Sequence, residues 1–86
     1  MVKKGGKKGQ YLAGLAKNLR AARKNKGLSQ EKAAWLSGIS YKFYQDVERG
    51  KKDITTHNLW KLSRALDITA DKLIPSLDED YLDLPE

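Results

Sequence analysis

The stretch SQEKAAWLSGISYKFYQDVERG, residues 29–50, constrains the fold of this chain more than any other feature. It predicts two short helices joined by a tight turn, because Gly38 stands where a chain that leaves a helix often needs a positive φ. Ser29 and Ser40 are typical N-caps for the two helices. The second helix has one apolar side that can pack and one polar side that points outward, as a helix in a DNA major groove requires.

The order and spacing of these residues resemble the helix-turn-helix of the phage repressor and Cro-type family of DNA-binding regulators. The resemblance extends beyond the turn and covers about residues 15–74. It implies an all-α, compact, five-helix repressor-like DNA-binding domain. The residues that carry it are Gly27, Leu28, Ser29, Gln30, Ala34, Gly38, Ile39, Ser40, Tyr44, Val47, Glu48, Arg49, Gly50 and Lys51, followed by Leu59, Leu62, Ala65, Leu66 and Leu73.

Apolar residues at helical spacing predict helices over about residues 11–26, 30–37, 41–49, 56–66 and 70–74. Residues 1–10 are expected to form a disordered basic arm, 11–75 the helix-turn-helix domain, and 76–86 an acidic C-terminal tail. Trp35 stands where the family usually has a polar residue. It either packs over the gap left by Ala33, which we expect, or is an exposed interface residue. Trp60 is either a residue at the rim of the core or a dimer contact.

The resemblance places the residues that contact DNA bases at the start of the second helix of the motif. It assigns Tyr41, Lys42 and Asp46 to base contacts, with Gln45 beside them. Lysine can donate to guanine, aspartate can accept from cytosine, and glutamine can pair with adenine. The alternative for Lys42 and Asp46 is an intrahelical ion pair four residues apart, and both roles can hold together.

Two further sets of residues follow from the motif. In the family, the residues at the positions of Arg23 and Glu48 pair between helices, and we expect a partly buried structural ion pair here. The resemblance gives Gln30 and Arg49 contacts to DNA phosphates, and helix N-termini and cations near them can add more. The expected phosphate-contacting residues are Gln30, Ser40, Arg49, Lys51, Lys52 and Thr55.

The charge of the chain is unevenly distributed. Its net charge is +6, but residues 1–75 contain seventeen basic and six acidic residues, a net charge of +11, while residues 76–86 are acidic. A basic body indicates a polyanionic partner once a helix-turn-helix is present. The chain has no cysteine, which excludes a zinc–thiolate site. His57 is its single histidine and has no cluster of other ligands around it, so no metal, cofactor or enzymatic activity is expected.

We therefore expect a cytoplasmic, sequence-specific regulator that binds double-stranded DNA, as a homodimeric repressor on an inverted-repeat operator. No membrane association or small-molecule ligand is evident. The alternative is a protein-binding module, such as an antitoxin that neutralises a partner through its acidic tail. Leu77, Tyr81, Leu82 and Leu84 interrupt the acids of that tail and would serve such a contact.

Overall fold

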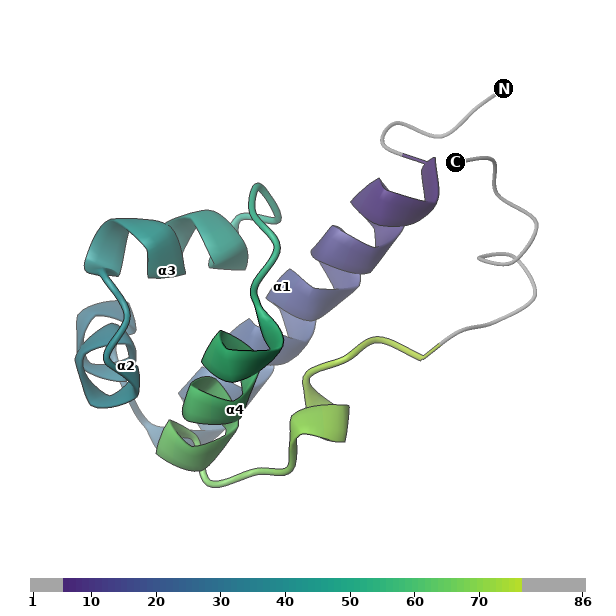
Figure 1. The fold of residues 1–86 in the computed structure, drawn as a ribbon. Coiled ribbons are helices and arrows are strands. Elements are labelled where there is room, and N and C mark those ends of the chain that lie inside the picture. The colour runs from purple at the N-terminus through teal and green to yellow at the C-terminus, as the bar shows by residue number, and fades with distance from the viewer. Residues whose placement is uncertain (1–5, 77–86) are drawn as a thin grey trace.

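The computed structural model describes residues 6–76, and within that range the chain forms four α-helices, one short 3₁₀ helix and no strand. Figure 1 shows three of the helices gathered along one side of the long first helix. The predicted all-α class is confirmed. The elements are α1 (Gly6–Lys26), α2 (Gln30–Ser37), α3 (Tyr41–Glu48), α4 (Thr56–Ala65) and η1 (Ala70–Lys72).

The fifth helix, predicted over residues 70–74, is instead a single 3₁₀ turn, so the count of five α-helices is wrong. Pro75 explains the early end, because a proline pushes the residue before it, here Ile74, out of the α conformation. Leu73 is fully buried as expected, whereas Ile74 is 43% exposed. The short turn still supplies the last apolar residue of the core.

Helix α1 begins at Gly6, five residues before the predicted start at Tyr11. Residues 6–10, which were expected to belong to a disordered arm, are therefore helical. Leu12 is buried in the packed part of α1, and adding residues to an existing helix costs little free energy. The remainder of the predicted arm and nearly all of the predicted acidic tail lie outside the described residues.

The core lies between α1 and the three helices packed on it. Ala33 of α2 is fully buried and leaves no gap, and Trp35 does not pack as expected but is 71% exposed. Two residues along a helix correspond to a rotation of about 200°, which places Trp35 on the opposite face from Ala33. The buried core cluster consists of Leu15, Leu19, Ala33, Ala34, Tyr44, Val47, Leu62, Leu66 and Leu73.

Candidate nucleic-acid interface

The turn between α2 and α3 fixes the direction of α3. The side chain of Ser29 caps the first turn of α2, and Gly38 ends that helix in the left-handed conformation with a φ of 67°. The Ser40 hydroxyl then accepts a hydrogen bond from the Phe43 N–H at 3.2 Å and starts α3. The three predicted capping residues thus act as expected, and α3 crosses over α2 at the surface of the domain (Figure 1).

The two sides of α3 differ as the sequence predicts. Tyr44 and Val47 are each 1% exposed and anchor the helix in the core. On the outer side, Tyr41 is 45% exposed and the side chain of Lys42 is 75% exposed, while Gln45 is half-buried. Residues at the start of α3 therefore present donors and acceptors to solvent.

Asp46 is the exception on this outer side, because it is only 8% exposed. Lys42 Nζ donates to its Oδ1 at 2.9 Å, which is the intrahelical pair expected as the alternative. That hydrogen bond, helped by the positive charges of Lys51 and Lys52, lowers the pKa of Asp46 although partial burial opposes the shift. Asp46 is thus a charged acceptor shielded by Lys42, and it can reach a base only if Lys42 moves aside.

A group of cations follows the end of α3. Gly50 has a φ of 75°, and the N–H of Lys51 caps the helix by donating to the Asp46 carbonyl at 2.9 Å. The turn leaves Arg49, Lys51 and Lys52 exposed beside one another in sequence. Exposed cations next to a helix that can enter a groove are suited to contact the phosphates that flank that groove.

The other expected phosphate contacts are divided between exposed and inward-facing groups. Ser40 and Thr55 are exposed N-caps of α3 and α4, and each hydroxyl accepts a hydrogen bond from its own helix. Gln30 is half-buried, and its Nε2 donates to Glu48 Oε1 at 2.8 Å. Only the second amide hydrogen and the backbone N–H of Gln30 remain for a phosphate.

Glu48 is the centre of a buried hydrogen-bond network that holds α1, α2 and α3 together. It is 2% exposed, and Arg23 Nε donates to its Oε2 at 2.7 Å while Arg23 Nη2 donates to its Oε1 at 3.2 Å. The Tyr44 hydroxyl donates to Oε2 at 2.6 Å. Arg23 also donates to the carbonyl of Leu28 at 2.9 Å, and Arg20 donates to the Glu48 carbonyl at 2.6 Å. The ion pair expected from the sequence is present as part of this larger network.

The network fixes the charge of its members. Burial alone would raise the pKa of Glu48, but the hydrogen bonds from Arg23, Tyr44 and Gln30 together outweigh it and lower that pKa. The pKa of Arg23 is raised, chiefly by its hydrogen bond to Glu48. Burial and the hydrogen bond to Glu48 raise the pKa of Tyr44. At neutral pH the site therefore holds a carboxylate, a guanidinium and a neutral phenol.

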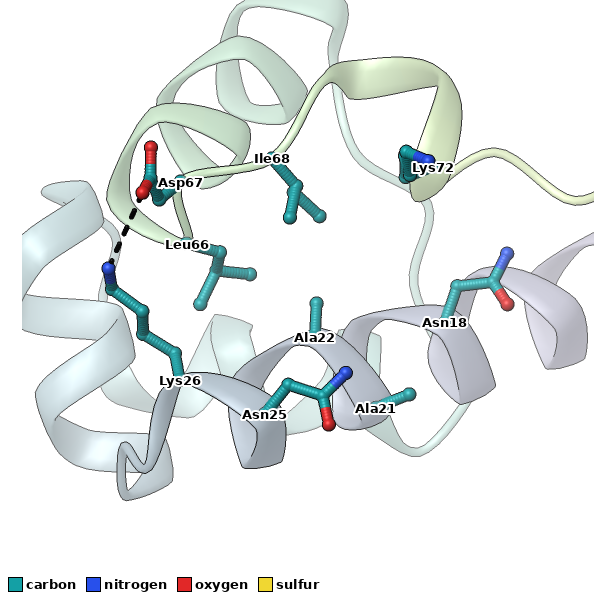
Figure 2. A pocket seen from close by; sticks show the side chains of 9 residues that line it. All are labelled: Asn18, Ala21, Ala22, Asn25, Lys26, Leu66, Asp67, Ile68 and Lys72. Carbon is teal, nitrogen blue, oxygen red and sulfur yellow. Dashed lines mark ion pairs between the residues drawn. The ribbon is translucent and has the colours of Figure 1, made fainter.

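A hollow of about 390 Å³ lies on a different side of the domain, between α1 and the segment that joins α4 to η1. Figure 2 shows Ala22, Leu66 and Ile68 pointing into it, with Lys26 Nζ 3.7 Å from an Asp67 carboxylate oxygen at one end. Neither α2 nor α3 contributes to its lining. The hollow is therefore separate from the candidate nucleic-acid interface.

The described part of the chain, residues 6–76, offers neither a metal-binding cluster nor a membrane-spanning helix. No group of three or more histidine or acidic side chains in this range is placed to hold a metal ion. No helix in the same range combines the length and the hydropathy that a membrane crossing requires.

Comparison with known proteins places this geometry in a family context. Residues 19–73 match the HTH_3 helix-turn-helix family. Control protein C.SmaI of Serratia marcescens is 37% identical over 60 residues, which are 70% of this chain and 71% of that protein. The restriction-modification controller protein C.AhdI from Aeromonas hydrophila is 41% identical with a TM-score of 0.71, over 73% of this chain and 96% of that one. The hypothetical transcription factor NHTF from Neisseria is 32% identical with a TM-score of 0.72, over 87% and 86% of the two chains.

Sequence reasoning missed three side chains of the Glu48 network, those of Tyr44, Gln30 and Arg20. Tyr44 precedes Glu48 by one helical turn, a spacing that places both side chains on one face and could have indicated their hydrogen bond. Gln30 approaches Glu48 from α2, and no local spacing signals this contact. For Trp35 the structure shows the exposed alternative and not the expected packing, and its helical position relative to Ala33 could have decided between the two.

Proposed function

The chain belongs to the HTH_3 helix-turn-helix family of transcriptional regulators, and we propose that it is a sequence-specific double-stranded DNA-binding regulator. In this proposal it acts as a homodimer that represses transcription from an inverted-repeat operator. The single observation that carries the proposal is the two-sided α3, which buries Tyr44 and Val47 and exposes Tyr41 and Lys42.

We assign base contacts to the outer side of α3. Lys42 has the reach and the exposed ammonium to donate to guanine O6 or N7, and the Tyr41 ring can contact a thymine methyl group. Gln45 and Asp46 lie deeper on the same side. Asp46 contributes by accepting a hydrogen bond from cytosine once Lys42 has turned toward a base. On binding, each of the two side chains therefore gives up its contact to the other and makes one to a base.

Phosphate contacts supply most of the affinity in the proposed complex. The proposed phosphate contacts come from two places. Arg49, Lys51 and Lys52 are exposed after the C-terminal end of α3, and the N-termini of α3 and α4 follow their caps Ser40 and Thr55. Contacts of this kind release counterions, so binding weakens steeply as salt rises. In a dimer the two α3 helices would lie about 34 Å apart, in successive major grooves on one face of the duplex.

The similar proteins named as controllers of restriction-modification systems favour a role in transcription control rather than catalysis. We accordingly propose a cytoplasmic protein with no enzymatic activity and no required cofactor. The antitoxin-like alternative depends on the acidic tail, and residues 77–86 lie outside the described part of the chain.

Selection of binding sites from a random DNA pool, followed by electrophoretic shift titration, tests the proposal. The selected duplex should contain an inverted repeat and bind at least about 10³-fold more tightly than a scrambled duplex at physiological salt. Sedimentation of the complex should give two protein chains per duplex. Equal affinity for the selected and scrambled duplexes would refute sequence-specific binding.

A further inference from the structure

An apolar surface on α2 and α4 has no role in the proposed DNA contact. Trp35, Leu36 and Trp60 are 71%, 45% and 54% exposed, and they line one shallow hollow of about 430 Å³ with Lys61 and Arg64. We call these five residues the tryptophan face. A contiguous exposed apolar patch with a polar rim is typical of a surface that binds another protein.

Cations surround the indoles of the tryptophan face. Lys32 Nζ lies 4.7 Å from the ring centre of Trp35, and Arg64 Cζ lies 5.4 Å from that of Trp60. Lys61 Nζ is 3.4 Å from the Gly38 carbonyl. Within residues 6–76, none of these three cations forms an ion pair with a carboxylate. A segment that alternates carboxylates with apolar side chains would match this face in both charge and hydropathy.

The C-terminal segment of the chain has this chemistry. Residues 77–86, LDEDYLDLPE, contain no basic residue. Their acids can pair with the cations of the tryptophan face, and their apolar residues can cover the indoles. The acidic residues are Asp78, Glu79, Asp80, Asp83 and Glu86, and the apolar ones interspersed among them are Leu77, Tyr81, Leu82 and Leu84.

The end of the described chain points away from its own tryptophan face. Asn18 of α1 donates to the Leu73 carbonyl at 3.1 Å, and a Cβ on Gly14 would lie 2.7 Å from Pro75. The chain therefore runs along α1 toward its N-terminal half, and Figure 1 shows this segment leaving on the side opposite α2. Ten extended residues span about 33–36 Å at most, and a segment that starts in this direction would have to turn back around its own domain to reach α2.

We propose that the tryptophan face binds residues 77–86 of a second copy of this chain, an inference that rests on the proposed homodimer. In a two-fold symmetric dimer the contact occurs twice, since each copy donates its C-terminal segment and receives that of the other. The contact leaves α3 free, so a dimer held in this way can still bind DNA. Leu82 and Leu84 supply the apolar part of the contact, and the acids supply charge complementarity.

Tryptophan fluorescence tests this proposal directly, because Trp35 and Trp60 are the only tryptophans of the chain and both lie on the tryptophan face. The full-length protein and its L82S/L84S variant are compared by emission maximum and acrylamide quenching over a dilution series. The tryptophans of the wild-type protein should be shielded at high concentration and exposed on dilution. The change should occur over the concentrations at which sedimentation shows that the dimer dissociates. The variant should show exposed tryptophans throughout.

A peptide titration provides the second measurement. A synthetic peptide of residues 76–86 is added to the L82S/L84S protein, whose own segment no longer competes. The peptide should shield the tryptophans saturably, and its own L82S/L84S version should bind at least about tenfold more weakly, because two buried leucines are lost. Circular dichroism confirms that the receptor variant is folded.

Each outcome decides the question. Shielding that depends on both the leucines and protein concentration supports the proposal. Shielding that depends on the leucines but not on concentration would overturn it in favour of binding within one chain, and tryptophans insensitive to the leucines would overturn it altogether. DNA binding is measured on the same samples. If selection from a random pool yields no duplex that the wild-type protein binds specifically, the proposed function fails whatever the fluorescence shows, whereas specific DNA binding without shielding removes only this inference.

Discussion

Replacement of Glu48 by alanine should cost a large part of the stability of the domain. The carboxylate accepts four hydrogen bonds from Arg23, Gln30 and Tyr44, at distances between 2.6 and 3.2 Å, and is 2% exposed. Removing one member of a buried ion pair leaves the other charge without compensation, here an Arg23 side chain that is only 13% exposed. The expected loss is about 3–5 kcal/mol. A domain of 86 residues has roughly 4–13 kcal/mol of stability in total.

Urea denaturation followed by circular dichroism measures this loss. Asp67→Asn is the matched control, because it removes the exposed carboxylate of the Lys26–Asp67 pair and keeps a residue that tolerates the φ of 57° at this position. The control should cost no more than about 1 kcal/mol. A loss in the Glu48→Ala variant as small as that in the control would refute the structural role of the network.

Three further results are expected. The pKa of Glu48 is lowered in the folded state, so its contribution to stability is complete above the ordinary pKa of 4.5 and is lost as the pH falls through the folded-state pKa. Denaturation at a series of pH values should show this loss. The Glu48→Gln variant should show a weaker dependence of stability on pH. Gly14→Ala places a Cβ 2.7 Å from Pro75 and should lower the free energy of unfolding by about 1–3 kcal/mol; an unchanged free energy of unfolding would contradict the close packing. In electrophoretic shift titrations, Lys42→Ala should lower the discrimination between bases by about 1–3 kcal/mol. Arg49→Ala should instead weaken binding to all duplexes alike and reduce the slope of log affinity against log salt concentration by about 1. Identical behaviour of the two variants would refute the division between base and phosphate contacts.

The local signals in the sequence predict the helix-turn-helix well because short-range chemistry determines it. The serine caps, the left-handed Gly38 and the burial of Tyr44 each follow from residues within one or two helical turns. Helix ends are harder to predict, because the glycines and lysines of residues 6–10 predict an unstructured arm although α1 begins at Gly6.

Contacts between distant elements were the least predictable part of the candidate site. The hydrogen bond from Gln30 to Glu48 depends on how α2 lies against α3, and no spacing in the sequence predicts that arrangement. The burial of Asp46 was not expected either, although its pair with Lys42 within α3 was the predicted alternative. The pairing of Arg23 with Glu48 could be expected because the family resemblance carried that tertiary information.

The central claim is that the exposed side of α3 lies against DNA bases. Backbone amide chemical-shift mapping, with a selected duplex added to the isotope-labelled protein, tests it most directly. The account predicts that the largest changes fall on residues 41–46, with a second group at residues 49–55, and that the indole N–H signals of Trp35 and Trp60 change little. Largest changes at those two indoles, with residues 41–46 unaffected, would contradict it.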